Sequence, residues 1–277
     1  MPPLSDKIAV VTGASRGVGR GIALGLGEAG ATVYVTGRTV HEGTALLPGT
    51  IHQTAEEVSH LGGKGIAMVC DHRNDTEVKT VFEQILAEQG HIDILVNNAW
   101  GGYEYMVEGS EFTWPKFFWE QPLWRWDTMF QAGVRAAYVA SQLAAPSMIA
   151  QSHGLIVNIS YWAAQKYMGN TPYGVAKAAT DKLTADIAHE LRPYNVAALA
   201  LYPGLVRTES IMQNAQFLDL SNSESPQFNG RAVAALAADP KIMDKSGHVC
   251  ITAALALEYG FTDIDGKQPR PLTLTEA

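Results

Sequence analysis

Short apolar runs alternate along this chain with longer segments whose apolar residues recur every three or four positions. The short runs predict strands at Ile8–Thr12, Thr32–Thr36, Gly65–Cys70, Ile94–Asn97, Leu155–Ser160, Val196–Tyr202 and His248–Thr252. The longer segments predict helices at Gly17–Ala29, Thr54–Leu61, Thr76–Gln89, Trp126–Ala150, Tyr173–Leu191 and Ala232–Ala238. Strands and helices that alternate in this way indicate an α/β fold, with a parallel sheet covered by helices on both faces.

Two segments interrupt this alternation. Residues 101–122 form a long connection that is rich in aromatic side chains: Tyr103, Tyr105, Phe112, Trp114, Phe117, Phe118 and Trp119. Residues 208–227 are mostly polar, with Met212 and Phe217 as exceptions. Long loops beyond the carboxyl ends of parallel strands are where such sheets bind ligands. Since neither an internal repeat nor a linker occurs, residues 1–277 are interpreted as one domain.

Composition narrows the classes of protein. The chain has 277 residues, 47% of them hydrophobic and 17% charged, which is typical of a globular fold. A net charge of −8 without a basic tract argues against a nucleic-acid partner. Two distant cysteines, Cys70 and Cys250, form no disulfide framework and favour a reducing cytoplasmic location. No signal peptide is recognised, and no apolar stretch reaches the ~18 residues of a membrane span.

A glycine-rich segment, Thr12–Gly19, follows the first predicted strand and opens the first predicted helix. Glycines permit a tight turn and let the backbone approach a pyrophosphate, and the helix N-terminus offers free N–H groups. The candidate cofactor-binding residues here are Gly13, Ser15, Arg16, Gly17, Val18 and Gly19. The spacing Gly-x3-Gly-x-Gly differs from the commoner fingerprint, so a glycine-rich turn without ligand is the alternative.

The end of the second strand bears on the choice between NAD(H) and NADP(H). NAD sites usually carry an acidic residue there, which holds the ribose hydroxyls, whereas this chain has Gly37 followed by Arg38. With Arg16 in the glycine-rich segment, two guanidinium groups favour a 2′-phosphate through charge-assisted bonds. We therefore predict NADP(H) over NAD(H). The alternative is that either arginine is simply solvated.

Tyr173 and Lys177 are four residues apart on a predicted helix, so their side chains share one face. A lysine ammonium beside a phenol lowers the phenol pKa, and such a phenol donates or accepts protons nearer neutral pH. Ser160 ends the fifth strand, and its hydroxyl is placed to hydrogen-bond a carbonyl oxygen of a substrate. An exposed helical Tyr–Lys pair without function is the alternative.

Together with Asn97-Asn98-Ala99 and Pro203-Gly204, these motifs resemble the short-chain dehydrogenase/reductase family over about residues 7–252. The resemblance implies a Rossmann-type, doubly wound domain and hydride transfer between NAD(P)(H) and a carbonyl or alcohol. It implies that Tyr173 is the general acid or base, that Lys177 lowers its pKa and binds the nicotinamide ribose, and that Ser160 polarises the carbonyl.

The same resemblance assigns further cofactor contacts and an assembly. Asp71, with His72 beside it, matches the adenine position, and Asn98 matches the residue along the adenosine side. The segment that flanks the nicotinamide matches at Pro203, Gly204, Val206 and Thr208. The family pairs its two long helices across dimer interfaces, so a homodimer or homotetramer is expected.

Two positions depart from the family pattern. Gly133 stands where many members carry an asparagine that supports a proton relay, and Trp100 stands where Asn-Asn-Ala is usually followed by glycine. Stretches such as Phe118-Trp119-Glu120-Gln121-Pro122 and Ala188-His189-Glu190-Leu191-Arg192 resemble one branch of the family, which shares the glycine. A catalytically weakened dinucleotide sensor is therefore one alternative, and a reductase of activated C=C bonds is another.

The aromatic segment, with Tyr161 and Trp162, predicts a pocket for a bulky apolar ketone. The alternative is that these aromatic residues only pack the loop onto the domain. The histidines and cysteines lack metal-ligand spacing, so no metal is expected.

Overall fold

A parallel sheet runs through the computed structural model, which describes residues 2–103, 106–108 and 111–276. Within those ranges its seven strands lie in the order β3-β2-β1-β4-β7-β8-β9, and neighbours pair in parallel. Their bounds are β1 Ile8–Val11, β2 Thr32–Gly37, β3 Lys64–Val69, β4 Ile94–Asn97, β7 Gly154–Ile159, β8 Val196–Tyr202 and β9 Val249–Ile251. The strand order reverses between β1 and β4, which is where doubly wound sheets bind ligands. The predicted Rossmann-type α/β fold is confirmed.

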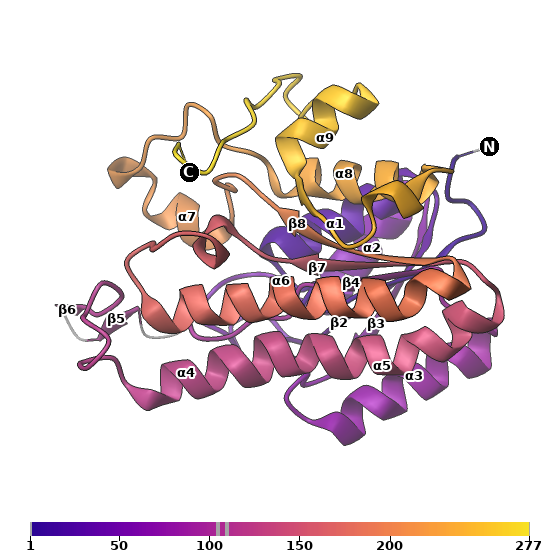
Figure 1. Cartoon of the computed structure of the whole chain (residues 1–277), viewed down its shortest axis with the longest axis horizontal. Coiled ribbons are helices and arrows are strands. Elements are labelled where there is room, and N and C mark those ends of the chain that lie inside the picture. Colours follow the sequence, from indigo (N-terminus) through magenta and orange to yellow (C-terminus); the bar gives the residue numbers. More distant parts are fainter. Residues whose placement is uncertain (1, 104–105, 109–110, 277) are drawn as a thin grey trace.

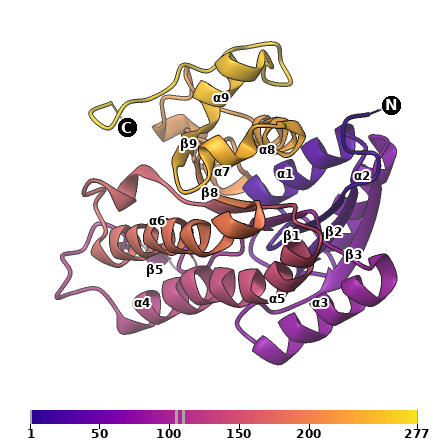
Figure 2. The same cartoon turned by 45° about the vertical axis from the view of Figure 1, so that its right-hand side comes forward.

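Helices cover both faces of this sheet (Figures 1 and 2). One face carries α1 Gly17–Glu28, α2 Ile51–His60, α8 Pro226–Ala238 and α9 Thr252–Tyr259. The other carries α3 Asp75–Gln89, α5 Ala136–Ala150 and α6 Thr171–Leu191. Side chains alternate along each strand, so Ala9 and Val11 enter the first layer while Ile8 and Val10 enter the second. Burial on both faces explains why the strands are nearly continuous apolar runs.

The long helix after the aromatic segment differs from the prediction. It begins earlier, as α4 Leu123–Met129, passes through a π-helical turn at Phe130–Arg135 and continues as α5. Pro146 lies inside α5 without ending it, because Ala144 and Met148 on either side are buried against the sheet. The irregularity therefore lies at the π-helical turn, a feature that often occurs at functional sites.

The C-terminal part is more ordered than its composition predicts. The polar segment 208–227 contains α7 Glu209–Gln213, and α8 begins at Pro226 rather than Ala232. Ser225 caps α8 by accepting the N–H of Phe228, and proline at the first helical position is a start signal that the apolar periodicity missed. The predicted strand His248–Thr252 is shorter, because Thr252 already begins α9. Within 101–122 a short hairpin forms from β5 Val107–Glu108 and β6 Glu111–Phe112.

Helices α1 and α8 pack backbone to backbone. A Cβ built on Gly25 would lie 2.6 Å from Cα of Gly230 and 2.7 Å from N of Arg231, far inside van der Waals contact. Since α1 also carries the glycine-rich turn at its N-terminus, this contact fixes the turn relative to β8 and the segment that follows it.

Candidate active site

The glycine-rich turn between β1 and α1 is held against the end of β4. Gly13 has a φ of 65° and Gly17 a φ of 58°, in the left-handed region that favours glycine. A Cβ on Gly13 would lie 2.8 Å from Cα of Ala99. The side-chain amide of Asn98 donates to the carbonyl oxygens of Thr12 and Gly13, both at 3.0 Å. Asn98 therefore stabilises the conformation of the turn.

The carboxylate of Glu209 lies at the N-terminus of α1. The backbone N–H of Gly17 donates to the Glu209 carboxylate at 2.9 Å, although the two residues are far apart in sequence. Helix N-termini bind anions through free N–H groups and the helix dipole. A carboxylate at this N–H shows that the turn accepts an anion, so the turn fits the pyrophosphate of a dinucleotide.

The two predicted arginines lie close enough to influence each other. Burial lowers the pKa of Arg16, and the charge of Arg38 lowers it further, whereas Glu209 opposes both. The Arg16 guanidinium donates to the carbonyl oxygens of Pro48 and Gly49 at 2.9 and 2.8 Å. The charge of Arg38 thus acts on Arg16, which lies in the glycine-rich turn. Within the same turn, Ser15 is buried and Val18 packs against the core.

Asp71 and His72 occupy different surroundings. The guanidinium of Arg73 binds the Asp71 carboxylate and lowers its pKa to about 2, so Asp71 is ionised. His72 is 6% exposed, and its Nε2 lies 2.7 Å from Oγ1 of Thr36. Burial lowers the pKa of His72 to about 4, so its ring is neutral. Asp71 is the more accessible of the two predicted adenine contacts.

Ser160, Tyr173 and Lys177 come together beyond the end of β7. Asn170 caps α6 by accepting the Tyr173 N–H at 2.9 Å, and this starts the helix so that Tyr173 and Lys177 share its inner face. The Ser160 hydroxyl donates to the Lys177 carbonyl oxygen at 3.4 Å, and the Lys177 ammonium donates to the Ile159 carbonyl oxygen at 3.1 Å. All three predicted residues are less than 9% exposed.

Burial and neighbouring phenols determine the direction of the Tyr173 pKa shift in this structure. Burial raises this pKa well above its ordinary value, and the phenol of Tyr103 raises it further as a hydrogen-bond partner. The Lys177 ammonium lies 5.7 Å from the centre of the Tyr173 ring and 3.8 Å from that of Trp100. Burial also lowers the pKa of Lys177 to about 7, opposed by Asp181, so its positive charge is incomplete at neutral pH.

Part of the aromatic segment covers Tyr173. The rings of Trp114, Tyr103 and Trp100 lie 5.3, 6.0 and 5.8 Å from the Tyr173 ring, and that of Tyr161 lies 6.4 Å away. Tyr103 is itself 47% exposed, and Phe112, Phe117, Phe118 and Trp119 of the same segment are also exposed. Tyr105 lies outside the described residues.

Two polar residues hold this aromatic cover in place. Asn170 donates to the Trp114 carbonyl oxygen at 2.9 Å, while the fully buried Arg125 donates to the hydroxyl and carbonyl oxygens of Thr113. Trp162 was predicted to line the same pocket, but it is 5% exposed and packs edge-on against Tyr202, with 5.3 Å between the ring centres. Its side chain therefore belongs to the core.

The segment after β8 is held by a residue that sequence reasoning missed. Glu224 is 1% exposed, accepts the Gly204 N–H at 2.9 Å and pairs with Val206 through its backbone. Burial raises the pKa of Glu224 to about 7. Pro203 is also buried. Thr208 caps α7 because its side chain accepts the N–H of Ile211. A single glutamate within a polar stretch carries no sequence signal for such burial.

Asp181 is a second residue that sequence reasoning missed. It lies one helical turn beyond Lys177 and accepts the Tyr202 hydroxyl. Burial raises the pKa of Asp181, while the hydroxyls of Ser160 and Tyr202 and the charge of Lys177 oppose the rise. The four-residue spacing from Lys177 was the available signal.

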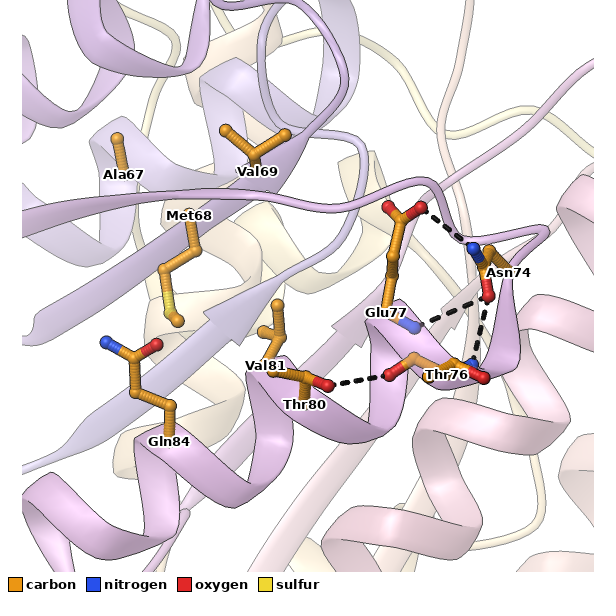
Figure 3. Close-up of a pocket in the computed structure, with 9 residues that line it drawn as sticks. All are labelled: Ala67, Met68, Val69, Asn74, Thr76, Glu77, Thr80, Val81 and Gln84. Atoms are coloured by element: carbon orange, nitrogen blue, oxygen red, sulfur yellow. Dashed lines mark hydrogen bonds between the residues drawn. The ribbon is translucent and has the colours of Figure 1, made fainter.

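A separate groove of about 410 Å³ lies between β3 and α3 (Figure 3). Its lining includes Met68 and Val69 on the strand and Glu77, Thr80 and Gln84 on the helix. It forms because β3 is the edge strand, beside which no further strand lies in this sheet. None of the site residues predicted from the sequence lines it.

The described residues show neither a cluster of metal-ligating side chains nor a membrane-spanning helix. In residues 2–103, 106–108 and 111–276, no three His, Cys, Asp or Glu side chains are grouped as a metal site would require. Over the same residues, no helix combines the length and apolar character needed to cross a bilayer.

The doubly wound sheet, the anion-binding turn and the buried Ser–Tyr–Lys group define a dinucleotide-dependent oxidoreductase. Residues 7–218 match the short chain dehydrogenase family model, and the chain belongs to that family, whose members act between CH–OH and C=O groups. The chain is 43% identical to mouse and 42% identical to human "Dehydrogenase/reductase SDR family member 1", over 96% of this chain and 85% of each relative. The branch inferred from the sequence is the branch of these relatives.

Solved structures agree with this assignment. A short chain dehydrogenase of Mycobacterium thermoresistibile is 28% identical, with a TM-score of 0.80 over 97% of this chain and 92% of that one. A metagenomic short-chain oxidoreductase in complex with NADP has 27% identity and a TM-score of 0.72, covering 90% and 97%. A 7α-hydroxysteroid dehydrogenase complexed with NADH and a 7-oxo bile acid has 26% identity and a TM-score of 0.73, covering 90% and 94%. Neighbours thus include complexes with each form of cofactor.

Proposed function

We propose that this protein is an NADP(H)-dependent oxidoreductase that interconverts a bulky apolar ketone and its alcohol. The observation that carries the proposal is the convergence of Ser160, Tyr173 and Lys177 at the strand ends, beside a turn that accepts an anion. The cofactor supplies or accepts the hydride when it is bound. We further propose that residues 1–277 act as one domain, with residues 101–122 and 208–227 on the substrate side.

The three residues divide the remaining chemistry. Tyr173 protonates the carbonyl oxygen in reduction and takes the proton in oxidation, while the Ser160 hydroxyl orients that oxygen. A phenol with a raised pKa remains protonated at neutral pH, which suits the acid role. Lys177 binds the nicotinamide ribose, and its positive charge near Tyr173 lowers the pKa of the phenol.

NADP(H) preference rests on Arg16 and Arg38. Their mutual repulsion favours an additional phosphate. The residue directly after β2 is Arg38, whereas NAD sites usually have an acidic residue there to bind the ribose hydroxyls. Asp71 and Asn98 contact the adenosine side, and Gly204, Val206 and Thr208 flank the nicotinamide. Comparing KM for NADPH and NADH in the wild type and in Arg38→Ala tests the preference. We expect the substitution to raise KM for NADPH at least ~10-fold with little change for NADH; a wild-type preference for NADH contradicts the proposal.

A bulky apolar substrate is proposed from the rings around Tyr173, chiefly Trp114 and Tyr103. Tyr173 is only 8% exposed, so a substrate must displace part of this aromatic cover. A panel of ketones and aldehydes with NADPH tests the proposal, and turnover of small polar carbonyls alone contradicts it. Reduction of an activated C=C bond is a separate outcome of the same panel.

Replacing Tyr173 with phenylalanine tests catalysis itself. We expect turnover to be abolished while NADPH binding, measured by fluorescence, is nearly unchanged, because only the proton-transferring hydroxyl is removed. Unchanged turnover refutes the assigned role. Binding without turnover in the wild type supports the alternative of a dinucleotide sensor.

Location and assembly belong to the same proposal. The thiols of Cys70 and Cys250 are free and buried, which suits a reducing cytoplasmic compartment. Exposed Tyr138 on α5 and Val175 on α6 lie on the helices that a homodimer or homotetramer would pair. Light scattering during size-exclusion chromatography measures the assembly, and a monomeric mass contradicts it.

A further inference from the structure

The two departures from the family pattern, Trp100 and Gly133, are in direct contact. Trp100 follows β4, whereas Gly133 lies in the π-helical turn between α4 and α5 and is buried. A Cβ built on Gly133 would lie 2.5 Å from Cζ3 and 2.6 Å from Cε3 of the indole. These atoms belong to a large planar ring, so either the indole or the helical turn would have to shift to make room for a methyl group. The indole of Trp100 therefore lies in space that glycine leaves open at position 133.

The face of this indole carries the ammonium of Lys177. The Nζ atom lies 3.8 Å from the ring centre, which is a close cation–π geometry. The edge of the same indole contacts Tyr173, with 5.8 Å between ring centres and an angle of 85° between planes. Trp100 thus touches both helical residues of the proposed catalytic group.

The ammonium of Lys177 is buried. Lys177 is 5% exposed, and its Nζ atom donates to the Ile159 carbonyl oxygen at 3.1 Å. The charge of Asp181, one turn further along α6, acts on it, and the centre of the Tyr173 ring lies 5.7 Å away. A buried ammonium needs compensation for lost water, and an aromatic face supplies it without a second carboxylate.

We propose that Trp100 is a positioning residue for Lys177, and that Gly133 is retained because it provides the space in which the indole lies. The proposal rests on the proposed function only where it assigns Lys177 a role beside Tyr173. In this arrangement no side chain from position 133 reaches the catalytic group. The glycine at position 133 is thus the counterpart of the tryptophan at position 100.

The contact itself is tested by thermal unfolding in two backgrounds, which needs no activity. In the wild type, Gly133→Ala should lower Tm, because the added methyl group overlaps the indole. In a Trp100→Gly background the same change should leave Tm unchanged or raise it, since alanine favours helix over glycine. An equal loss of Tm in both backgrounds overturns the pairing.

The effect on Lys177 is tested by pH titration of tryptophan fluorescence, followed by kinetics. An ammonium over the indole should give a pH-dependent component that disappears in both Lys177→Met and Trp100→Phe, because each removes one partner. A component that survives in Trp100→Phe overturns the positioning role.

In turnover, Trp100→Leu should lower kcat about 10-fold and shift the acidic limb of the pH profile, whereas Trp100→Phe, which keeps an aromatic face, should retain more activity. Equal kcat and equal pH profiles for the two variants also overturn the positioning role. A wild type without turnover refutes the proposed function, while the unfolding and fluorescence experiments still decide the role of Trp100.

Discussion

The close contact between α1 and α8 predicts that Gly25→Ala destabilises the protein. Helix propensity alone predicts the opposite, because alanine is favoured over glycine by ~1 kcal/mol in a helix interior. The structure reverses this sign, because the new methyl group would lie 2.6 Å from Cα of Gly230. Ordinary contact begins near ~3.5 Å, so the two backbones must separate by about 1 Å.

The magnitude follows from the two opposing effects. Overpacking in a rigid core costs ~1–3 kcal/mol, and here the obstacle is backbone that has no alternative rotamer, so the upper end applies. Subtracting the gain in helix propensity leaves a net loss of about 2 kcal/mol. At ~2–4 °C per kcal/mol for a chain of this size, Tm should fall by about 4–8 °C.

Urea denaturation followed by circular dichroism measures this loss, and Gly27→Ala on the same helix is the matched control. A Cβ on Gly27 would meet the Cγ1 methyl group and the backbone carbonyl oxygen of Val58, both at 3.0 Å, which is a milder overlap than the one at Gly25. The control should therefore lose less stability than Gly25→Ala. A Gly25→Ala variant that is as stable as the wild type, or more stable, would refute the reasoning about the helix contact.

Three further predictions concern single side chains. Glu209→Gln removes the carboxylate that competes for the Gly17 N–H, so NADPH should bind about 5-fold more tightly; weaker binding in fluorescence titration contradicts this. Arg125→Met leaves the oxygens of Thr113 without their buried donor, so the unfolding free energy should fall by about 2–3 kcal/mol and limited proteolysis within 101–122 should accelerate; equal cleavage rates contradict this. The pKa of Glu224 is raised to about 7 from an ordinary 4.5, so its contribution to stability is present below pH 4.5 and is lost as pH rises through 7. Glu224→Gln should therefore gain stability relative to the wild type, up to roughly 3 kcal/mol, between pH 5 and pH 8; a constant difference across that range contradicts this.

The sequence by itself determined the fold class, and it predicted the residues of the candidate site. Buried parallel strands must be apolar on both faces, so the strands could be recognised as continuous apolar runs. The glycine-rich turn could be recognised because tight turns need backbone conformations that other residues disfavour. Ser160, Tyr173 and Lys177 were recognisable because helical spacing and a strand end place them together. Elements with weak apolar periodicity, such as α7 and the start of α8, were missed because capping and tertiary contacts form them.

Only the tertiary structure decided what surrounds these residues. Trp100 and Gly133 were two separate oddities along the chain, and their contact depends on packing between β4 and the π-helical turn. The same holds for the burial of Glu224 and for the raised pKa of Tyr173, because desolvation depends on neighbours that are distant in sequence. Local patterns therefore specified which groups could react, while three-dimensional packing specified their charge and orientation.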